Sequence, residues 1–242
     1  KREVEYSEIQ SSDTVIEIGA GLGTLTSPLA EKAKKVFAIE KDQKLLRVLK
    51  DKLCIYNNVE IISGDALKLE FPLAQKIVSN IPYSISSPLT FKILSAKYER
   101  AVLTYQLEFA ERLIAKPGTK NYGRITVGVY YKAEAKLLEK IPKTAFYPPP
   151  KVASAMVMLK PKPPPFEPLN EKAFFEVVRF LFMYPNRKAK HGVRYYLKNK
   201  NNRDSKLTLE FPPEILEKRV RNLTLNEIQK IADILLSESN SP

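Results

Sequence analysis

Three glycines, Gly19, Gly21 and Gly23, alternate with other residues in the segment 17–23 (EIGAGLG), between a strand-like run and an amphipathic stretch. Glycine has no Cβ atom, so its backbone can turn sharply and approach a ligand closely. The spacing is Gly-x-Gly-x-Gly and differs from the Gly-x-Gly-x-x-Gly fingerprint of dinucleotide-binding folds. The loop therefore predicts a ligand pocket at the end of a strand. The alternative is a plain turn without a ligand.

Two carboxylates stand at the ends of the next two expected strands. Glu40 ends the second strand, where an acidic side chain can accept hydrogen bonds from ribose hydroxyls. Asp65 ends the third strand, where its carboxylate or a neighbouring backbone group can meet an adenine edge. Together with the glycine loop, these residues predict a pocket for an adenosine-bearing cofactor at the carboxyl ends of parallel strands. On this evidence a nicotinamide cofactor, and hence an oxidoreductase, remains an alternative.

The segment Asn80-Ile81-Pro82-Tyr83 follows the fourth expected strand and is suited to hold an amino group of a nucleobase. Such an amine is a poor nucleophile because its lone pair is delocalised into the ring, so a methylating site must orient it. The Asn80 side-chain oxygen and the Ile81 carbonyl oxygen can accept its N–H bonds, while Pro82 fixes the backbone. Tyr83 offers a ring on which a flipped base can stack. The alternative is an Asn-x-Pro turn beside a buried tyrosine.

Short apolar runs typical of buried strands alternate with helical stretches in the first part of the chain. These strand-like runs cover 14–18, 35–39, 59–63, 76–79 and 101–105. Helical patterns cover 24–34 and 43–53, and a third helix is expected to begin with Ser87 as N-cap and Pro88 in the first helical position. This alternation predicts an α/β fold, in which a mostly parallel sheet is covered by helices on both faces.

The pattern changes after the fifth strand. One helix and two further strands are expected over 123–132, 135–141 and 154–160. Prolines then cluster between Pro161 and Pro168, and this segment cannot continue a helix or a central strand. We therefore expect a first domain over 1–164 and a small helical C-terminal domain over 165–242, whose last helix begins with the capping box 224–227.

Composition narrows the function classes. The chain has 242 residues, a net charge of +13, one cysteine (Cys54) and one histidine (His191). An internal disulfide and a cysteine-cluster metal site are excluded, Ser-His-Asp hydrolysis is disfavoured, and no metal is expected. No apolar run reaches the roughly 18 residues that span a bilayer, so no membrane partner is expected. No signal or transit segment is visible, although residues ahead of Lys1 would hide one.

The excess of positive charge predicts a polyanionic partner, and it is concentrated late in the chain. Residues 187–203 hold seven Lys or Arg residues and no acid, with Tyr195 and Tyr196 among them. A basic helix with interleaved aromatics suits phosphate contacts along structured RNA. The RNA-binding candidates are Arg187, Lys188, Lys190 and Arg194. The alternative is a solvated helix face.

These motifs together resemble the S-adenosylmethionine-dependent ribosomal RNA adenine N6-dimethyltransferases of the KsgA type. The segments 17–23, 64–66 and 80–83 and the residue Glu40 match the family, as do 105–112 (YQLEFAER) and 146–152 (FYPPPKV). The tract 115–124 is most similar to archaeal members. The resemblance covers residues 14–160 strongly and the remainder loosely.

The resemblance implies a Rossmann-like methyltransferase fold and S-adenosylmethionine as cofactor. The implied cofactor-binding residues are Glu17, Gly19, Ala20, Gly21, Glu40, Lys41, Asp65, Ala66 and Asn80. Asn80, Ile81 and Pro82 would present the target amine, with Tyr83 and Phe146 as aromatic partners of the base. The Gly-Gln-x-Phe-Leu segment that precedes the glycine loop in this family is absent from the sequence. If this segment is deleted, cofactor binding should be weakened; if it lies ahead of Lys1, nothing follows for the cofactor site.

The implied reaction transfers two methyl groups to each of two adjacent adenosines near the 3′ end of small-subunit ribosomal RNA. The implied partner is a pre-ribosomal small subunit, and the protein is expected to be a cytoplasmic monomer. One alternative is the related antibiotic-resistance enzyme that modifies large-subunit RNA. Another is a non-catalytic assembly factor that retains the fold and binds RNA through its basic tail.

Overall fold

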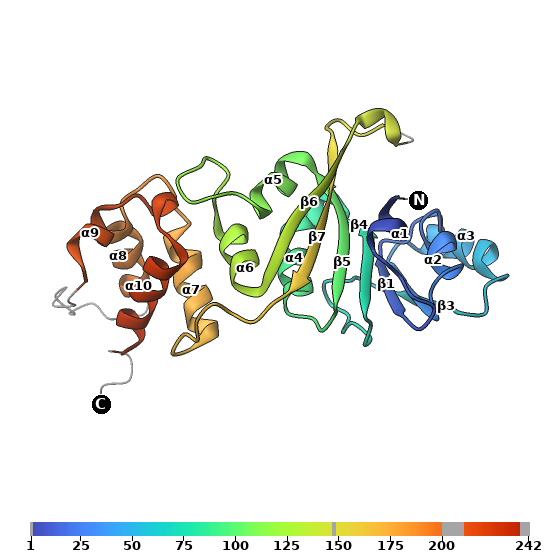
Figure 1. Ribbon diagram of the computed structural model, residues 1–242, viewed down its shortest axis with the longest axis horizontal. Helices are drawn as coiled ribbons and strands as arrows, with labels where there is room; N and C mark the ends of the chain where they lie inside the picture. Colours follow the sequence, from blue (N-terminus) through green and yellow to red (C-terminus); the bar gives the residue numbers. More distant parts are fainter. Residues whose placement is uncertain (1, 147–148, 200–210, 238–242) are drawn as a thin grey trace. The chain divides into compact units, whose positions relative to one another are not determined.

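The computed structural model describes residues 2–146, 149–199 and 211–237 (Figure 1). The chain forms two units, of which the first comprises 1–111 and 132–162 and the second 112–131 and 163–242. The expected boundary near residue 164 lies close to the crossing at 162–163. The sequence predicted one boundary, with all of residues 1–164 in the first domain. In the structure, residues 112–131 belong to the second unit instead, because their apolar side chains pack into its core.

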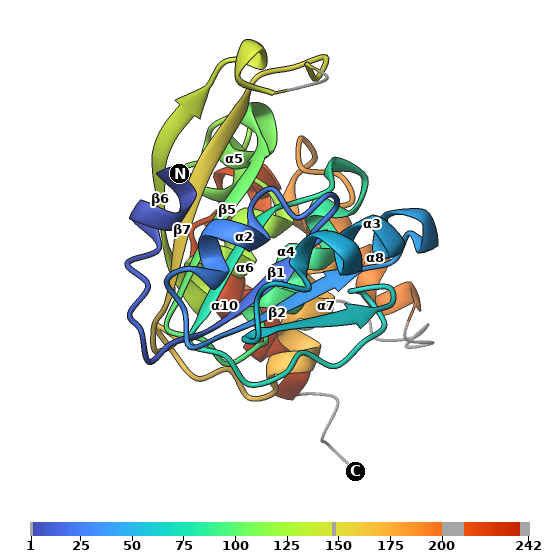
Figure 2. The ribbon, with the colours of Figure 1, turned by 90° about the vertical axis from the view of Figure 1, so that its right-hand side faces the viewer.

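The described part of the first unit contains a seven-stranded sheet of order β3-β2-β1-β4-β5-β7-β6 (Figures 1 and 2). The strands are β1 (Thr14–Ile18), β2 (Lys35–Glu40), β3 (Val59–Ser63), β4 (Lys76–Asn80), β5 (Arg100–Gln106), β6 (Ala133–Ile141) and β7 (Ser154–Pro161). Strands β1 to β5 pair in parallel, and β7 is antiparallel to both β5 and β6. The predicted mostly parallel sheet is therefore confirmed.

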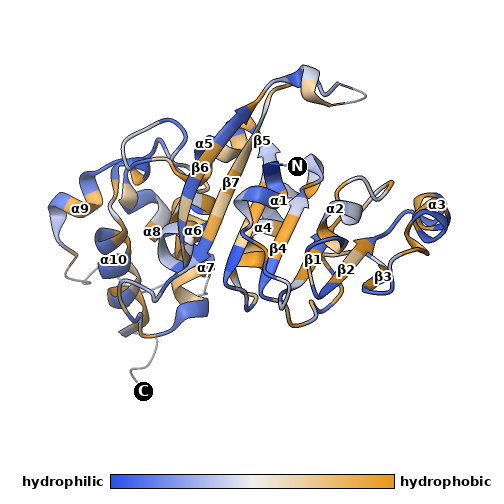
Figure 3. Ribbon diagram, turned by 45° about the vertical axis from the view of Figure 1, so that its right-hand side comes forward, coloured by the Kyte–Doolittle hydropathy of each residue, from blue (hydrophilic) through white to orange (hydrophobic). Residues whose placement is uncertain are grey.

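The central strands are buried along nearly their whole length, and β1 and β2 are largely hydrophobic (Figure 3). Val15, Val36 and Val78 pack on one face against α1 (Arg2–Tyr6) and α2 (Thr26–Ala30). Successive strand side chains point to opposite faces. The neighbouring helices of the sheet are α3 (Gln43–Leu53), α4 (Ser86–Leu94) and α5 (Leu107–Leu113).

The opposite face of β1 is covered by the end of α4. Ile16, which is adjacent to Val15 in β1, lines a hollow together with Lys92 and Ser95 at the C-terminal end of α4. Helices therefore lie on both faces of the sheet, as the alternation of strands and helices predicts.

Two helix predictions were wrong in their limits. The helix expected over 24–34 is α2, which covers only Thr26–Ala30 because the chain must turn back to enter β2. The helix α4 begins at Ser86, directly after a 3₁₀ turn (Tyr83–Ile85), so Ser87 is not its N-cap. Pro88 lies in the first turn instead, where its missing N–H has no intrahelical acceptor to lose.

The second unit is helical in its described part. It contains most of α6 (Arg124–Lys132), followed by α7 (Glu171–Leu181), α8 (Ala189–Asn199), α9 (Pro213–Glu217) and α10 (Leu225–Ser237). Aromatic rings at Tyr131, Phe166 and Phe174 pack in its core. The predicted capping box is confirmed, since Thr224 N–H donates to Glu227 Oε2 and Glu227 N–H donates to Thr224 Oγ1. Within the described ranges, no helix has the length and apolar character needed to cross a membrane.

Candidate active site

The glycine loop leaves β1 and is bound to the end of β2. The backbone N–H groups of Gly19 and Ala20 both donate to the carbonyl oxygen of Ile39, at 2.7 and 3.1 Å. Gly19 has φ +76°, a conformation that L side chains rarely adopt. A Cβ atom on Gly19 would also lie 3.3 Å from Cγ of Pro82. Glycine is therefore required at this position both for the turn and for close approach to the Asn80–Tyr83 segment.

The side chain of Glu40, at the end of β2, also binds the backbone of the glycine loop. Its Oε2 accepts a hydrogen bond from Gly21 N at 2.9 Å, and its Oε1 accepts from Lys41 N at 2.8 Å and Asp42 N at 2.9 Å. The side chain is largely buried, and carboxylates bind such N–H donors more strongly than neutral acceptors do. Glu40 therefore shapes the pocket that it was predicted to line.

A hollow of about 260 Å³ opens at the carboxyl ends of β1, β2 and β3. It is lined by Ile18, Gly19, Gly21, Ile39, Glu40, Lys41, Leu45, Gly64, Asp65, Ala66, Pro82, Ser84 and Ile85. Apolar walls with a few carboxylates suit an adenosine group, whose ring is flat and whose ribose hydroxyls donate hydrogen bonds. The glycine loop supplies a surface that a Cβ atom would fill. These residues fit S-adenosylmethionine.

Six of the nine predicted cofactor residues line this hollow, and three do not. Ala20 is 5% exposed, and its N–H group is bound to Ile39. Glu17 is buried, and Asn80 lines a different hollow. The apolar lining residues Leu45 and Ile85 were missed, since nothing in their sequence context separates them from ordinary core residues.

A second hollow, of about 440 Å³, lies in the same unit. It is lined by Arg2, Glu3, Asn80, Glu139, Ile141, Pro142, Ala145, Phe146 and Met156. Asn80 and Phe146, which are distant in sequence, therefore meet at one cavity. Pro82 lines the first hollow, so the Asn80–Pro82 turn borders both. Within the described residues, the exposed Asn80 carboxamide makes no hydrogen bond and is available to a ligand.

The structure anchors the two other members of this segment. Ile81 is 1% exposed, and its N–H donates to Thr104 O at 3.0 Å, which binds the turn to β5. The Tyr83 hydroxyl is 2.6 Å from Ser154 Oγ on β7, and Tyr83 lines neither hollow. Of the predicted segment 146–152, residues 147 and 148 lie outside the described ranges.

Glu17 is a buried carboxyl beneath the glycine loop. It is 2% exposed, and within the described residues its Oε2 has no hydrogen-bond partner. Burial raises the pKa of Glu17 from 4.5 to about 8, against an opposing effect of the Thr26 hydroxyl. The nearby carboxylates of Glu3 and Glu40 raise this pKa further. Glu17 therefore supports the loop as a largely neutral acid near pH 7.

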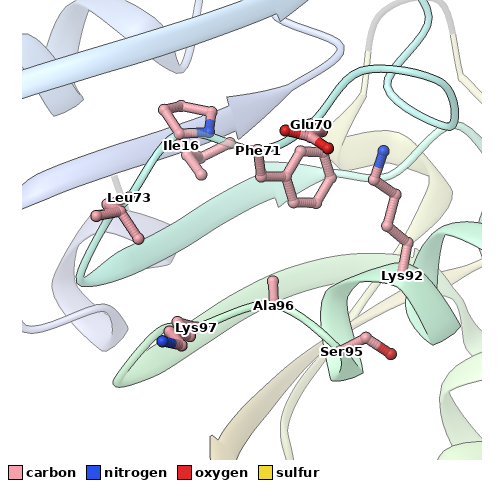
Figure 4. Close-up of a pocket in the computed structure, with 9 residues that line it drawn as sticks. Ile16, Glu70, Phe71, Leu73, Lys92, Ser95, Ala96 and Lys97 are labelled. Atoms are coloured by element: carbon pink, nitrogen blue, oxygen red, sulfur yellow. The ribbon is translucent and has the colours of Figure 1, made fainter.

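Lys92 on α4 was not predicted from the sequence, yet it holds the turn that carries Asp65. Its Nζ donates to Ala66 O at 2.7 Å and also to Leu69 O, and it lies 4.6 Å from the centroid of the Phe71 ring (Figure 4). Within the same turn, Asp65 Oδ1 accepts from the N–H of Leu67. The available signal was that Lys92 is the single charged residue of α4.

The first prediction concerns Gly19. The Gly19→Ala substitution should weaken binding of S-adenosylmethionine, the cofactor that the resemblance implies, about tenfold or more, because alanine is strained at φ +76° and its Cβ meets Pro82. Titration calorimetry would measure the affinity. Gly118→Ala is the matched control, since Gly118 has φ +87° but open space around it. Equal affinity of wild type and Gly19→Ala for S-adenosylmethionine would contradict the assignment of this hollow as the cofactor site.

The second prediction concerns Glu17 and pH. Between about pH 4.5 and pH 8 the unfolded chain releases the Glu17 proton while the folded protein retains it, so the free energy of unfolding falls as pH rises. Glu17→Gln cannot ionise and lacks this loss. Urea unfolding from about pH 5 to pH 8 should show the variant gaining stability relative to wild type. The exposed Glu5→Gln is the control, and a pH-independent difference for Glu17→Gln would refute the prediction.

The third prediction concerns Lys92. Lys92→Met removes charge-assisted hydrogen bonds to the turn 65–69, so the KM for S-adenosylmethionine should rise about 5- to 10-fold while kcat at saturating cofactor is retained. Lys97→Met is the control, because the exposed Lys97 lines the same hollow as Lys92 without binding this turn. A fall in kcat with unchanged KM would show that Lys92 does not act through the turn.

Comparisons with known proteins agree with this geometry. The family model described as "Ribosomal RNA adenine dimethylase" matches residues 1–234. A protein of Thermococcus sibiricus named "Probable ribosomal RNA small subunit methyltransferase A" is 47% identical, over 99% of this chain and 88% of its own length. A protein of Methanosarcina acetivorans with the same name is 44% identical, over 97% of this chain and 87% of its own.

Solved structures show the same relationship. A dimethyladenosine transferase from Plasmodium falciparum superposes with a TM-score of 0.76 at 32% identity, covering 98% of this chain and 94% of the other. The 23S rRNA methyltransferase ErmE superposes with a TM-score of 0.67 at 28% identity, covering 97% and 95%. The fold is thus the Rossmann-like methyltransferase fold, and the cofactor is S-adenosylmethionine. The chain belongs to the ribosomal RNA adenine dimethylase family.

Proposed function

We propose that this protein transfers two methyl groups to the N6 amine of each of two adjacent adenosines near the 3′ end of small-subunit ribosomal RNA. The observation that carries the proposal is the Asn80–Pro82 turn, which borders the cofactor hollow on one side and the hollow with Phe146 on the other. A base in the second hollow would therefore present its amine to a methyl donor in the first. The names of the archaeal relatives support the small subunit as the target.

The chain's own residues supply orientation rather than a strong base. Bound S-adenosylmethionine supplies an electrophilic methyl group on a sulfonium. The Asn80 carboxamide oxygen and the Ile81 carbonyl oxygen accept the two N–H bonds of the amine and aim its lone pair at that methyl carbon. The methyl group would leave the sulfonium as the amine nitrogen takes it up, and the amine would then release a proton to water. Preorganised acceptors of this kind lower the barrier without a protein base.

The structure places the two predicted aromatic partners of the base, Phe146 and Tyr83, in different surroundings. Phe146 lines the second hollow and can stack directly on a base there. Tyr83 is bound to Ser154 through its hydroxyl, so its ring is held in place beside the turn. We propose that Phe146 is the principal stacking residue. Tyr83 lines neither hollow, so in this proposal it holds the turn in place through its bond to Ser154.

We further propose that the second unit binds RNA. Among the four candidate cations, Lys188 and Lys190 both donate to Glu217 at 2.5 Å, and these bonds lower the pKa of Glu217 to about 2. The exposed Arg187 and Arg194 form no ion pair within the described residues, which leaves their full charge for phosphates. Of the same basic run, Lys200 and Arg203 lie outside the described ranges.

A pre-ribosomal small subunit is the proposed substrate particle, and a cytoplasmic monomer is the proposed working form. The net charge of +13 supports a polyanionic partner. The likeness to ErmE makes large-subunit RNA the competing substrate. Incubation with labelled methyl donor and either immature small subunits or naked large-subunit RNA separates the two, because mapping of the modified bases identifies the target. Modification of large-subunit RNA alone would overturn the proposal.

The fourth prediction tests the acceptor site. Asn80→Ala should lower the rate of methyl transfer to immature small subunits about 100- to 1,000-fold, the usual effect of losing one preorganised hydrogen-bonding group. Binding of S-adenosylmethionine should change little, because Asn80 lines the second hollow and not the cofactor hollow. The exposed Asn57→Ala serves as control. Wild-type rates in Asn80→Ala would refute the mechanism.

A further inference from the structure

Two half-exposed tyrosines lie together on the second unit, away from its core. Tyr184 is 50% exposed and Tyr195 is 44% exposed, and their ring centroids are 6.3 Å apart at an interplanar angle of 79°. Tyr184 belongs to the connection between α7 and α8, and Tyr195 belongs to α8; these two helices are neighbours in Figure 1. We call this pair the tyrosine platform.

The platform is supported from below by a buried ring. Phe180 of α7 is 4% exposed, and its centroid is 6.0 Å from that of Tyr195. The next residue of α8, Tyr196, is buried and packs edge-on against Phe180 as well. Tyr196, which the sequence grouped with Tyr195, is thus a core residue. Tyr195 is held on one side and open on the other, so a ligand would meet a ring whose position is already set.

Exposed cations lie close to the platform in the sequence. Arg194 precedes Tyr195 in α8, Lys198 follows it by one helical turn, and Arg187 follows Tyr184 by three residues. All three side chains are exposed, and none takes part in an ion pair within the described residues. A ligand that fits both features must combine a flat aromatic group with flanking negative charge. An unpaired nucleotide within an RNA strand has this chemistry.

We propose that Tyr184 and Tyr195 form a stacking site for an unpaired RNA base, with Arg187, Arg194 and Lys198 binding the flanking phosphates. The inference rests on the RNA-binding role proposed for the second unit and names the part of the RNA that this surface takes. The site is separate from the target-base site, which lies in the first unit. It would add affinity for single-stranded or looped RNA without reading a particular base, because every base has an aromatic face.

Salt separates the contributions of rings and cations. When a protein binds RNA phosphates, a plot of the logarithm of the association constant against the logarithm of the salt concentration has a negative slope. For a single strand, each phosphate contact contributes about 0.7 to the size of this slope. Stacking releases no counterions. Tyr195→Leu should therefore lower affinity equally at every salt concentration and leave the slope unchanged. Arg194→Gln should make the slope shallower by about 0.7.

The experiment uses the full chain without methyl donor and two probes of equal length. One probe is single-stranded oligoadenylate, and the other is an abasic ribose-phosphate oligomer with the same charge. Tyr195→Leu should weaken oligoadenylate binding roughly 5- to 100-fold, the range for loss of one base stack. Tyr184→Leu should weaken it by a smaller factor, because the Tyr184 ring stands at 79° to that of Tyr195 and meets a base stacked there only at its edge. Binding of the abasic probe should not change. Tyr195→Phe should retain wild-type affinity, because it keeps the ring.

Control variants and an unfolding measurement test whether the loss of affinity has a cause other than the loss of a ring. Leu169 is 66% exposed in the same unit, so Leu169→Ala tests the loss of an exposed apolar side chain that is not a ring. Thermal unfolding reports whether the leucine variants remain folded. Since all variants share an unaltered first unit, a base held in the target hollow contributes equally to each measurement.

Three results would overturn the stacking proposal. The first is that the leucine variants lose the same affinity for the abasic probe as for oligoadenylate. The second is that neither leucine variant loses affinity for oligoadenylate. The third is that the leucine variants lose as much affinity for anionic phospholipid vesicles as for oligoadenylate. The last result would identify a membrane surface as the partner. Methyl transfer to immature small subunits is measured separately. Wild-type chain that stacks bases but transfers no methyl group would refute the proposed function and leave the platform standing.

Discussion

The contact of the glycine loop with the Asn80–Pro82 turn holds together the two segments on which the candidate site of the first unit depends. Gly19 approaches Pro82 more closely than any residue with a Cβ atom could without displacing it. The Glu40 carboxylate accepts three backbone N–H groups and fixes the loop and the end of β2 in this position. Each such bond to a charged acceptor contributes about 1.5–3 kcal/mol. The Asn80–Pro82 turn, against which the loop is held, borders both hollows.

The same arrangement has a cost in stability. The parallel strands end where the ligands bind, and the polar groups needed there must be buried under the loop. Glu40 is satisfied by backbone donors, whereas Glu17 is buried with one oxygen unpartnered among the described residues. A buried ionised carboxylate without donors is strongly unfavourable, so the group stays neutral instead. Stability near neutral pH is therefore reduced where the cofactor site is built.

Local patterns predicted the sheet, and with the family resemblance they predicted six of the thirteen residues that line the cofactor hollow. Both predictions depend on short-range signals. Apolar runs determine buried strands, and the glycine spacing determines the loop that leaves β1. Lys92 could not be found in this way, since a long side chain on α4 reaches a turn more than twenty residues earlier in the chain. The pairing of Tyr83 with Ser154 and the packing of 112–131 in the second unit also depend on tertiary contacts.

The distribution of charge and rings between the units explains how a site with so few polar groups can act on a large RNA. The Asn80 carboxamide and one peptide oxygen can recognise the amine of any adenine, so they carry little information about which adenosine is methylated. Selection must then come from contacts made elsewhere along the RNA. The second unit offers cations that form no ion pair among the described residues and an exposed ring pair, and under the proposed function these would bind backbone and unpaired bases independently of the reacting amine. Under the proposed function, affinity and chemistry are therefore carried by different residues, and substitutions in one unit should leave the intrinsic step of the other unchanged.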